Sequence, residues 1–205
     1  QPLNAINVST QTILYGLARG WNINEEKATR SLNLVVDQVK RMTDIIANIR
    51  AFTRDSLPAP RENESLNIQV KRVFTMLGEQ IRAHNIDVSF RLGDIPDIRM
   101  NTQQILQVIV NLVTNARQAL DEVEKPGKGI VVSTFVEDQC AILEVTDNGP
   151  GIPEHMKEKI FDPFFTTKEV GRGTGLGLSI SAGIVHDHNG ELDVRNNENG
   201  GATFV

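Results

Sequence analysis

The sequence predicts an α+β protein in which an N-terminal antiparallel helical hairpin precedes an α/β sandwich with a mixed sheet. Three observations support this prediction. Apolar residues in the first 54 positions recur at spacings of three and four, which is the helical period. Two prolines among polar residues mark residues 55–64 as a linker. Beyond the linker, helical periodicity and strand-like alternation take turns as far as residue 205.

The composition excludes several classes of protein. Of the 205 residues, 40% are hydrophobic and 23% are charged, so the chain can bury a sizeable core. A net charge of -5 argues against a nucleic-acid-binding face. Since no apolar run reaches the ~18 residues that span a bilayer, we expect a soluble, cytoplasmic segment without membrane contact. The start at Gln1 leads us to expect a longer protein, with any sensor or membrane anchor upstream.

The first 54 residues predict two helices. The first carries apolar residues that include Leu3, Ile6 and Leu17, and it ends near Gly20. The second begins after a capping Asn24. Its apolar seam comprises Leu32, Val35, Val39, Met42, Ile46 and Ile49. Two helices with one stripe each cannot close a core, which favours a four-helix bundle made by two copies of the chain. The alternative is a hairpin packed against its own second domain.

The second domain predicts alternating helices and strands. Helices are expected at 66–83, from Asn101 onward, near 153–160 and around 178–188, and strands at 86–92, 129–136, 140–147, 190–196 and 201–205. Asn101 and Gln104 form a capping-box signature at the start of the long helix. The single cysteine, Cys140, lies in an alternating apolar pattern, so we expect it in the core of a protein from a reducing compartment.

Asp147 is the first candidate for ligand recognition. Strand alternation places it on the same face as the apolar Leu143 and Val145. A carboxylate there requires good hydrogen bonds, and Gly149 and Gly151 would let the backbone approach a flat ligand closely. The exocyclic amino group of adenine would satisfy such a carboxylate. The alternative is that Asp147 only begins an Asp-Asn-Gly-Pro-Gly turn.

The long helix carries a stripe of amides where a solvated face would carry charges. Its members are Gln104, Gln107, Asn111, Asn115 and Gln118, and Arg117 is the only charged residue from Thr102 to Leu120. Asn111 and Asn115 lie one turn apart on the same face. Amide oxygens suit a magnesium ion that shares its site with substrate phosphates. The alternative is an amphipathic helix with an amide-rich outer face.

The loop "TTKEVGRGTGLGLS" at 166–179 places glycine at every second position from 171 to 177. It matches neither the Walker loop nor the dinucleotide-binding fingerprint. Alternate glycines let backbone N–H groups converge on an anion, and the following helix points its N-terminus into the loop. Lys168 and Arg172 would add positive charge, and Thr174 a hydroxyl. The alternative is a mobile surface loop.

Taken in order, these motifs resemble the catalytic domain of sensor histidine kinases, within the ATPase superfamily shared with gyrase, mismatch-repair ATPases and the heat-shock chaperone. "NLVTNA" resembles the N box, "DNGPGI" the first glycine box, "IFDPFF" the F box and "GRGTGLGLS" the second glycine box. "QPLNAI" is similar to the end of the H box, and "QVKRMTDIIANIRAFTR" to the second dimerisation helix. The resemblance covers nearly the whole chain.

The resemblance implies a dimerisation and phosphotransfer hairpin at 1–54 and a catalytic ATP-binding domain at 65–205. Asp147 would accept a hydrogen bond from adenine, and Asn115 would ligate Mg²⁺ with Asn111 beside it. The nucleotide would also contact Gly149, Gly151, Ile152, Lys168, Arg172, Gly173, Thr174, Gly175, Leu176 and Gly177. The phospho-accepting histidine would lie four residues before Gln1, and Gln1 would be the position that helps water attack the phosphohistidine.

The implied activity is that of an ATP-dependent protein-histidine kinase of a two-component system. It would act as a homodimer and pass the phosphoryl group to the receiver domain of a response regulator. Position 118 is Gln where many relatives carry a basic phosphate contact, and Arg117 is a candidate substitute. The alternatives are an ATP-driven clamp of the chaperone or gyrase type and a non-catalytic dimeric signalling module. Asn111 replaces the glutamate that activates water in the clamp branches, which favours a kinase.

Overall fold

The computed structural model describes residues 2–20, 24–53, 60–168, 174–198 and 200–205, without the side chains of 40, 41 and 43–53. The chain divides into two compact units. One contains the helical hairpin, and the other comprises residues 57–167 and 174–205. Within the described residues, none of the helices combines the length and the apolar character needed to span a bilayer.

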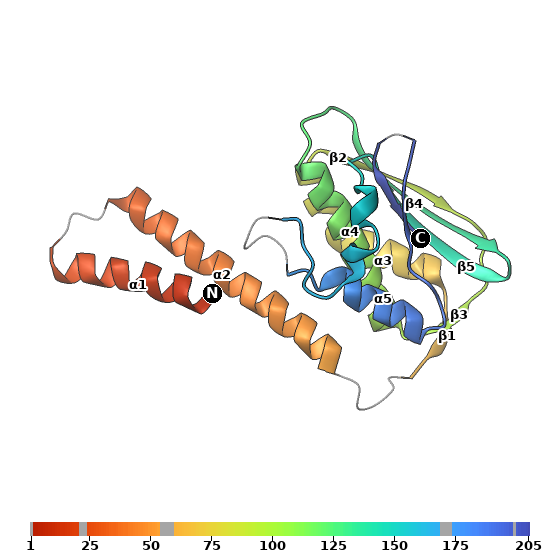
Figure 1. Ribbon diagram of the computed structural model, residues 1–205, viewed down its shortest axis with the longest axis horizontal. Coiled ribbons are helices and arrows are strands. Elements are labelled where there is room, and N and C mark those ends of the chain that lie inside the picture. Colours follow the sequence, from red (N-terminus) through yellow and green to blue (C-terminus); the bar gives the residue numbers. More distant parts are fainter. Residues whose placement is uncertain (1, 21–23, 54–59, 169–173, 199) are drawn as a thin grey trace. The chain divides into compact units, whose positions relative to one another are not determined.

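The hairpin consists of α1 (Pro2–Ala18) and α2 (Glu25–Thr53), which pack against each other as antiparallel helices (Figure 1). The predicted cap forms, since Asn24 Oδ1 accepts a hydrogen bond from the Lys27 N–H at 3.0 Å. Gly20, with φ of 68°, follows the end of α1 as predicted. Of the seam on α2, Leu32 and Val39 are exposed in the single chain. Val35 and Met42 are half-buried, and the side chains of Ile46 and Ile49 lie outside the described set.

The second unit contains a five-stranded sheet in the order β2-β4-β5-β7-β6. Its strands are β2 (Ile86–Leu92), β4 (Lys128–Glu137), β5 (Cys140–Asp147), β6 (Val194–Asn196) and β7 (Ala202–Phe204). β2 and β4 pair in parallel and the other neighbours pair antiparallel, so the predicted mixed sheet is confirmed. A separate antiparallel pair joins β1 (Glu62–Glu64) to β3 (Ile98–Met100). β1 therefore occupies the end of the segment predicted as linker.

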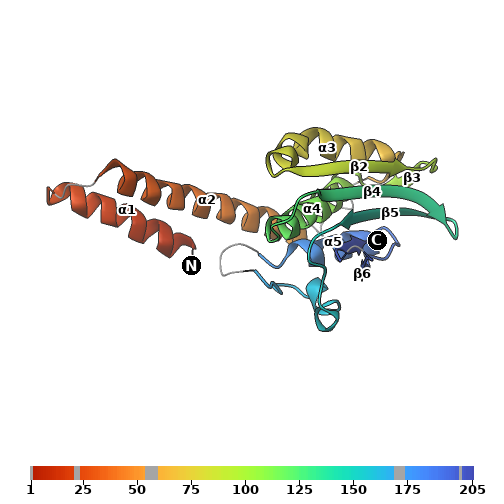
Figure 2. The same ribbon diagram turned by 90° about the horizontal axis from the view of Figure 1, so that it is seen from above.

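Three helices cover one face of this sheet: α3 (Leu66–Ala83), α4 (Thr102–Asp121) and α5 (Gly177–Asp187) (Figure 1). In Figure 2 they follow the order of the strands, with α3 beside β2 and α4 beside β4 and β5. α4 is the central helix, because it contacts α3, α5 and two strands. Its Ile109, Leu112 and Ala116 are almost fully buried and form part of the core. The predicted α+β class is thus confirmed.

Three local expectations differ from the structure. Cys140 is exposed, because it begins β5 directly after the tight turn of the β4–β5 hairpin at Asp138 and Gln139, where the strand leaves the helical cover. The expected short helix near 153–160 is a pair of 3₁₀ turns, Glu154–Met156 and Lys159–Phe161.

The start of α4 also differs in one detail. Asn101 Oδ1 caps the helix by accepting from the N–H groups of Gln103 and Gln104. The Asn101 N–H, which a capping box would pair with the Gln104 side chain, donates instead to His188 Nε2 at 3.0 Å. The end of α5 therefore supplies the partner that the capping box was expected to provide.

Candidate nucleotide-binding site

Asp147 lies at the end of β5 with 3% of its surface exposed. In the sheet it is opposite Ile130, which is 1% exposed, so both face the helices. Its Oδ1 accepts a hydrogen bond from the Gly149 N–H at 2.7 Å and a long one from the Ala202 N–H at 3.4 Å. No described residue donates to Oδ2, so half of this carboxylate lacks a partner in the described protein.

Burial raises the pKa of Asp147 above its ordinary value of 3.8. The two backbone hydrogen bonds from Gly149 and Ala202 and the charge of Lys125 act in the opposite direction but do not cancel the desolvation. A carboxylate that is buried, incompletely hydrogen-bonded and raised in pKa is typical of a ligand-recognition site. The plain turn, the alternative interpretation of Asp147, would not require this burial.

The glycine box that follows Asp147 forms a tight turn fixed by its own side chains. Asn148 joins it to the start of β4, because Oδ1 accepts from the Gly129 N–H at 2.9 Å and Nδ2 donates to the Gly127 carbonyl at 2.8 Å. The Lys125 ammonium donates to the Asn148 carbonyl. The ammonium charge thereby lies near Asp147 at the edge of the site.

The glycines of this box are required by the packing of the protein itself. A Cβ at Gly149 would lie 2.8 Å from Asp147 Oδ1 and 3.4 Å from Ala119 Cβ. A Cβ at Gly151, where φ is 74°, would lie 2.7 Å from the Gly200 carbonyl oxygen. Close packing within the protein therefore requires glycine at both positions, and the sequence alone did not predict this packing.

α4 leads from the glycine box towards the start of α5. Ala119, Asn115 and Asn111 follow one another at intervals of one turn, and all are half-buried. Ala119 lies against Gly149. At the other end, Asn111 Nδ2 lies 3.2 Å from both the Gly177 carbonyl and Ser181 Oγ of α5 and donates to them. Asn115 lies between these two contacts.

The oxygens of both asparagines are available for a ligand. Within the described part of the chain, no donor reaches Asn111 Oδ1, because that amide is oriented by its Nδ2 contacts. Asn115 makes no hydrogen bond there either. Two neighbouring amide oxygens fit the oxygen preference of Mg²⁺.

The second glycine box leads into α5. Leu176 is buried, Thr174 Oγ1 accepts from the Leu176 N–H at 3.4 Å, and among the described residues no side-chain cap is found at the start of the helix. The first turn of α5 thus keeps N–H groups for a ligand, as an anion site requires. Gly175, with φ of 66°, packs against the F box, since a Cβ there would lie 2.7 Å from the Phe165 carbonyl oxygen.

The remaining expected site residues divide into two groups. Gln1, Arg172 and Gly173 lie outside the described residues. Lys168 and Ile152 are described and half-buried. The backbone N–H and carbonyl of Ile152 both form hydrogen bonds with the side chain of Asn196.

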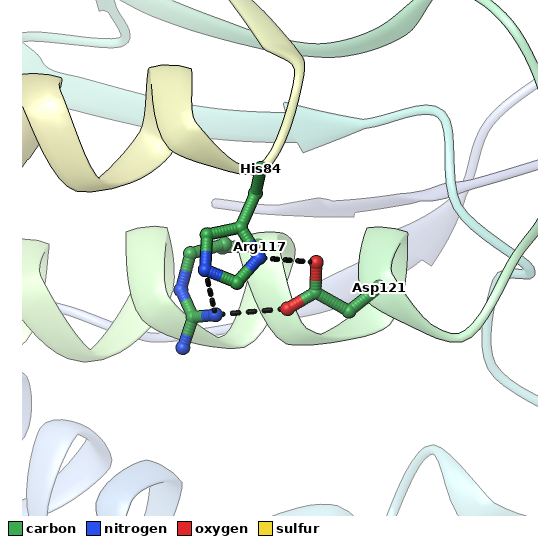
Figure 3. A network of polar contacts seen from close by, with 3 residues as sticks. All are labelled: His84, Arg117 and Asp121. Atoms are coloured by element: carbon green, nitrogen blue, oxygen red, sulfur yellow. Dashed lines mark hydrogen bonds and ion pairs between the residues drawn. The ribbon is translucent and has the colours of Figure 1, made fainter.

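Arg117 is engaged away from the amides (Figure 3). Its guanidinium contacts Asp121 Oδ2 at 2.8 Å and His84 Nε2 at 3.4 Å. His84, at the end of α3, also contacts Asp121 Oδ1 through Nδ1 at 2.7 Å. The structure therefore does not support Arg117 as the substitute phosphate contact, because its charge joins α3 to the last turn of α4.

The sequence did not indicate three residues whose side chains form hydrogen bonds with the backbone of the first glycine box, namely Lys125, Asn196 and Asn197. Asn196 and Asn197 belong to "RNNENGG", which the sequence indicates only as the turn between the last two strands. Lys125 follows α4 in a polar segment with no motif. The doubled Asn was the one available signal, because asparagine side chains commonly bond to nearby backbone in turns.

Comparison with known proteins agrees with this geometry. Residues 100–205, just over half of the chain, match the family model described as "Histidine kinase-, DNA gyrase B-, and HSP90-like ATPase". The C4-dicarboxylate transport sensor protein DctB of Pseudomonas aeruginosa is 34% identical over 182 residues, covering 86% of this chain and 29% of DctB. The sensor protein FixL of Bradyrhizobium diazoefficiens is 31% identical over 205 residues, covering 100% of this chain and 40% of FixL.

A solved structure extends the likeness to both units. The histidine kinase ThkA, in complex with the response regulator protein TrrA, has a TM-score of 0.77 and 28% identity, covering 99% of this chain and 57% of that chain. The catalytic domain of ThkA alone has a TM-score of 0.62 and 36% identity, covering 71% of this chain and 95% of that chain.

The fold and the site define an ATP-binding catalytic domain of the kind found in histidine kinases. The chain belongs to the histidine kinase-, DNA gyrase B- and HSP90-like ATPase family, and within it to the sensor histidine kinases. The chain spans less than half of the length of DctB and FixL.

We predict that Asp147→Asn stabilises the nucleotide-free protein. A carboxyl whose folded-state pKa is raised binds its proton more tightly in the folded state, so stability increases as the pH falls from the folded pKa towards 3.8. The variant lacks this titration. Its advantage in free energy of unfolding, measured by urea denaturation, should be largest at neutral pH and shrink on acidification.

Asp87→Asn makes the same substitution at an exposed position of the edge strand β2 and is the matched control. An advantage of Asp147→Asn that stays constant with pH would contradict the raised pKa, and a loss of stability would assign Asp147 a structural role.

Proposed function

We propose that the chain is the dimerisation and catalytic core of an ATP-dependent protein-histidine kinase. It would transfer the γ-phosphoryl group of MgATP to a histidine on the hairpin of the intact protein, and an aspartate on a response-regulator receiver domain would receive it next. The single observation that carries this proposal is the buried, half-satisfied carboxylate of Asp147 at one end of a line of open amides on α4.

Asp147 would bind the adenine end of the nucleotide. A buried carboxylate discriminates strongly between a base that donates a hydrogen bond and one that does not, because an unpaired buried acceptor is costly. Adenine offers an exocyclic N–H donor where guanine offers a carbonyl acceptor. The free Oδ2 can take this hydrogen bond while Oδ1 keeps its bond to the Gly149 N–H.

Asn115 and Asn111 would hold the metal-bound phosphate end. When bound, Mg²⁺ neutralises charge that develops on the transferring phosphoryl group. The asparagine oxygens orient this end without adding negative charge beside the phosphates. The open N–H groups at the start of α5 would bind the same anionic end.

The transfer itself needs positioning more than acid-base chemistry. A neutral imidazole nitrogen uses its lone pair to form a bond to the γ-phosphorus, and the bond between that phosphorus and the bridging oxygen breaks, releasing ADP. None of the four histidines, His84, His155, His186 and His188, lies in the hairpin segment 1–54. The acceptor would therefore be a histidine that the intact protein contributes to the hairpin.

The contact of Asn111 supports a kinase over an ATP-driven clamp. Its amide donates to the Gly177 carbonyl, which a carboxylate could not do. A glutamate that activates water would therefore lose this contact at position 111. The geometry suits an amide that orients the start of α5 and leaves its oxygen for the nucleotide.

The hairpin supports the proposed homodimer. Both helices carry large apolar side chains that are exposed in the single chain, among them Leu3 at 67%, Leu14 at 64%, Leu17 at 65% and Leu32 at 53%. Apolar residues at this density on an exposed helical face are typical of an interface. A second hairpin would complete a four-helix bundle.

We predict that Asn115→Ala removes the Mg²⁺-dependent part of ATP binding and leaves the fold intact. The side chain makes no hydrogen bond within the described protein, so its loss should change the free energy of unfolding by less than about 0.5 kcal/mol. Calorimetric titration with ATP, with and without magnesium, measures the effect. Gln103→Ala, on the exposed side of the same helix, is the control, and an unchanged magnesium dependence in Asn115→Ala would refute the assignment.

The kinase activity predicts an acid-labile, base-stable label on the full-length protein incubated with ATP carrying a radioactive γ-phosphate. This lability distinguishes a phosphoramidate from a serine or threonine ester. GTP should not replace ATP. Label that survives acid, or equal labelling from both nucleotides, would overturn the proposed function.

Light scattering should give the mass of a dimer for this chain, and Leu32→Glu should shift it to the monomer, because a buried unpaired carboxylate is costly. Asn33→Glu changes the next exposed position of α2 and is the control. A monomer at high concentration of the unmodified chain would refute the four-helix bundle.

A further inference from the structure

Residues at the end of β6 and the start of β7 form hydrogen bonds with the first glycine box. We propose that Asn196, the last residue of β6, and Asn197, which follows it, are positioning residues for adenine recognition, acting through Asp147 and Ile152. This inference rests on the proposed function of Asp147. The two asparagines and their contacts with the glycine box are called the asparagine clasp below.

Asn196 pairs with the far end of the glycine box. Its Oδ1 accepts from the Ile152 N–H at 2.8 Å, and its Nδ2 donates to the Ile152 carbonyl at 2.8 Å. The side-chain amide thus imitates the exchange of two hydrogen bonds between paired strands. Because both bonds come from one rigid planar group, they fix both the position and the orientation of Ile152.

Asn197 holds the near end of the same turn. Its Nδ2 donates to the Asp147 carbonyl at 2.8 Å, and its Oδ1 accepts from the Gly201 N–H at 3.2 Å. The next residue, Ala202, donates its N–H to the Asp147 carboxylate. The backbone and the side chain of Asp147 are therefore both bound, the first by Asn197 and the second by Ala202.

The shape of the glycine box depends on the clasp. A Cβ on Gly151 would lie 2.7 Å from the Gly200 oxygen and 3.0 Å from Asn196 Oδ1. A Cβ on Gly201 would overlap the Asp147 carbonyl group. The two segments approach so closely that only glycine fits at either position, and the side chains of Asn196 and Asn197 bridge the remaining separation.

The clasp determines where the free oxygen of Asp147 points. That carboxylate receives only one short hydrogen bond from its own turn, from the Gly149 N–H. Its direction is otherwise set by the backbone on which it stands, and the clasp binds that backbone at Asp147 and Ile152. Loss of the clasp would let the Asp147 carboxylate move out of the plane of the adenine. Nucleotide binding would then have to order this side chain, and the entropy lost in doing so would weaken the affinity.

Calorimetry with ATP and ADP tests this role in Asn196→Ala and Asn197→Ala. Each variant should bind both nucleotides about three- to tenfold more weakly, the effect of losing one or two hydrogen bonds. The factor should be the same for ATP and ADP, because both carry adenine. A disturbed phosphate contact would instead weaken ATP more. The fitted stoichiometry measures the folded fraction, so unfolding is distinguished from weaker binding.

Asn196→Asp tests the donor separately, because it keeps the acceptor for the Ile152 N–H and places a carboxylate oxygen against the Ile152 carbonyl oxygen. Two facing acceptors repel, so its affinity should fall at least as far as that of Asn196→Ala. Asn63→Ala, an exposed asparagine of β1 in the same unit, is the matched control and should bind like the parent.

Asp147→Asn separates this inference from the function on which it rests. If Asp147→Asn abolishes binding while both alanine variants bind like the parent, the clasp is refuted and the adenine role of Asp147 stands. If Asp147→Asn binds like the parent, both are refuted. A lower stoichiometry with an unchanged dissociation constant in the alanine variants would also refute the clasp, since it would show a purely structural role.

Discussion

The site depends on one costly feature, a carboxylate almost removed from water without a full set of hydrogen-bond partners in the described protein. Asp147 ends the buried face of β5, where its neighbours along the strand are apolar. Burying a charge in this way opposes folding, and the same desolvation raises the pKa of Asp147. The surrounding packing of α4 on the sheet must supply the stability that this group removes. A residue that weakens the free protein is retained most readily where a ligand completes its hydrogen bonds.

The same packing turns α4 into a scaffold for the whole site. One of its faces is the core of the unit, with Ile109 and Leu112 almost fully buried. The adjoining face presents Ala119 to the glycine box and Asn111 to the start of α5. Because a helix is rigid and rises about 1.5 Å per residue, these two contacts fix a spacing of about 12 Å between the two ends of the site. Asn115 lies within that span.

The sequence predicted the helices and strands and the burial of Asp147 better than the tertiary contacts around the site. Periodicity located α4 and β5, and strand alternation placed Asp147 on the buried face, because both signals are local. The function of Gly151 could not be predicted, since its constraint comes from the Gly200 carbonyl, 49 positions along the chain. Arg117 was misjudged for the same reason: nothing near it in the sequence indicates His84. Cys140 followed the strand pattern, but that pattern contains no information on where the helical cover ends.

The order of the strands has a consequence for how the protein is made. Although β7 follows every other described strand in the sequence, it lies inside the sheet between β5 and β6. A nascent chain that has emerged only as far as β6 cannot pair that strand with the rest of the sheet, and it leaves one edge of β5 open. The pairing of Val145 with Phe204 spans a long loop of chain, which is slow to close. We therefore expect the sheet of the ATP-binding unit to be completed only after β7 has emerged, and an intermediate lacking β7 to expose a strand edge to aggregation.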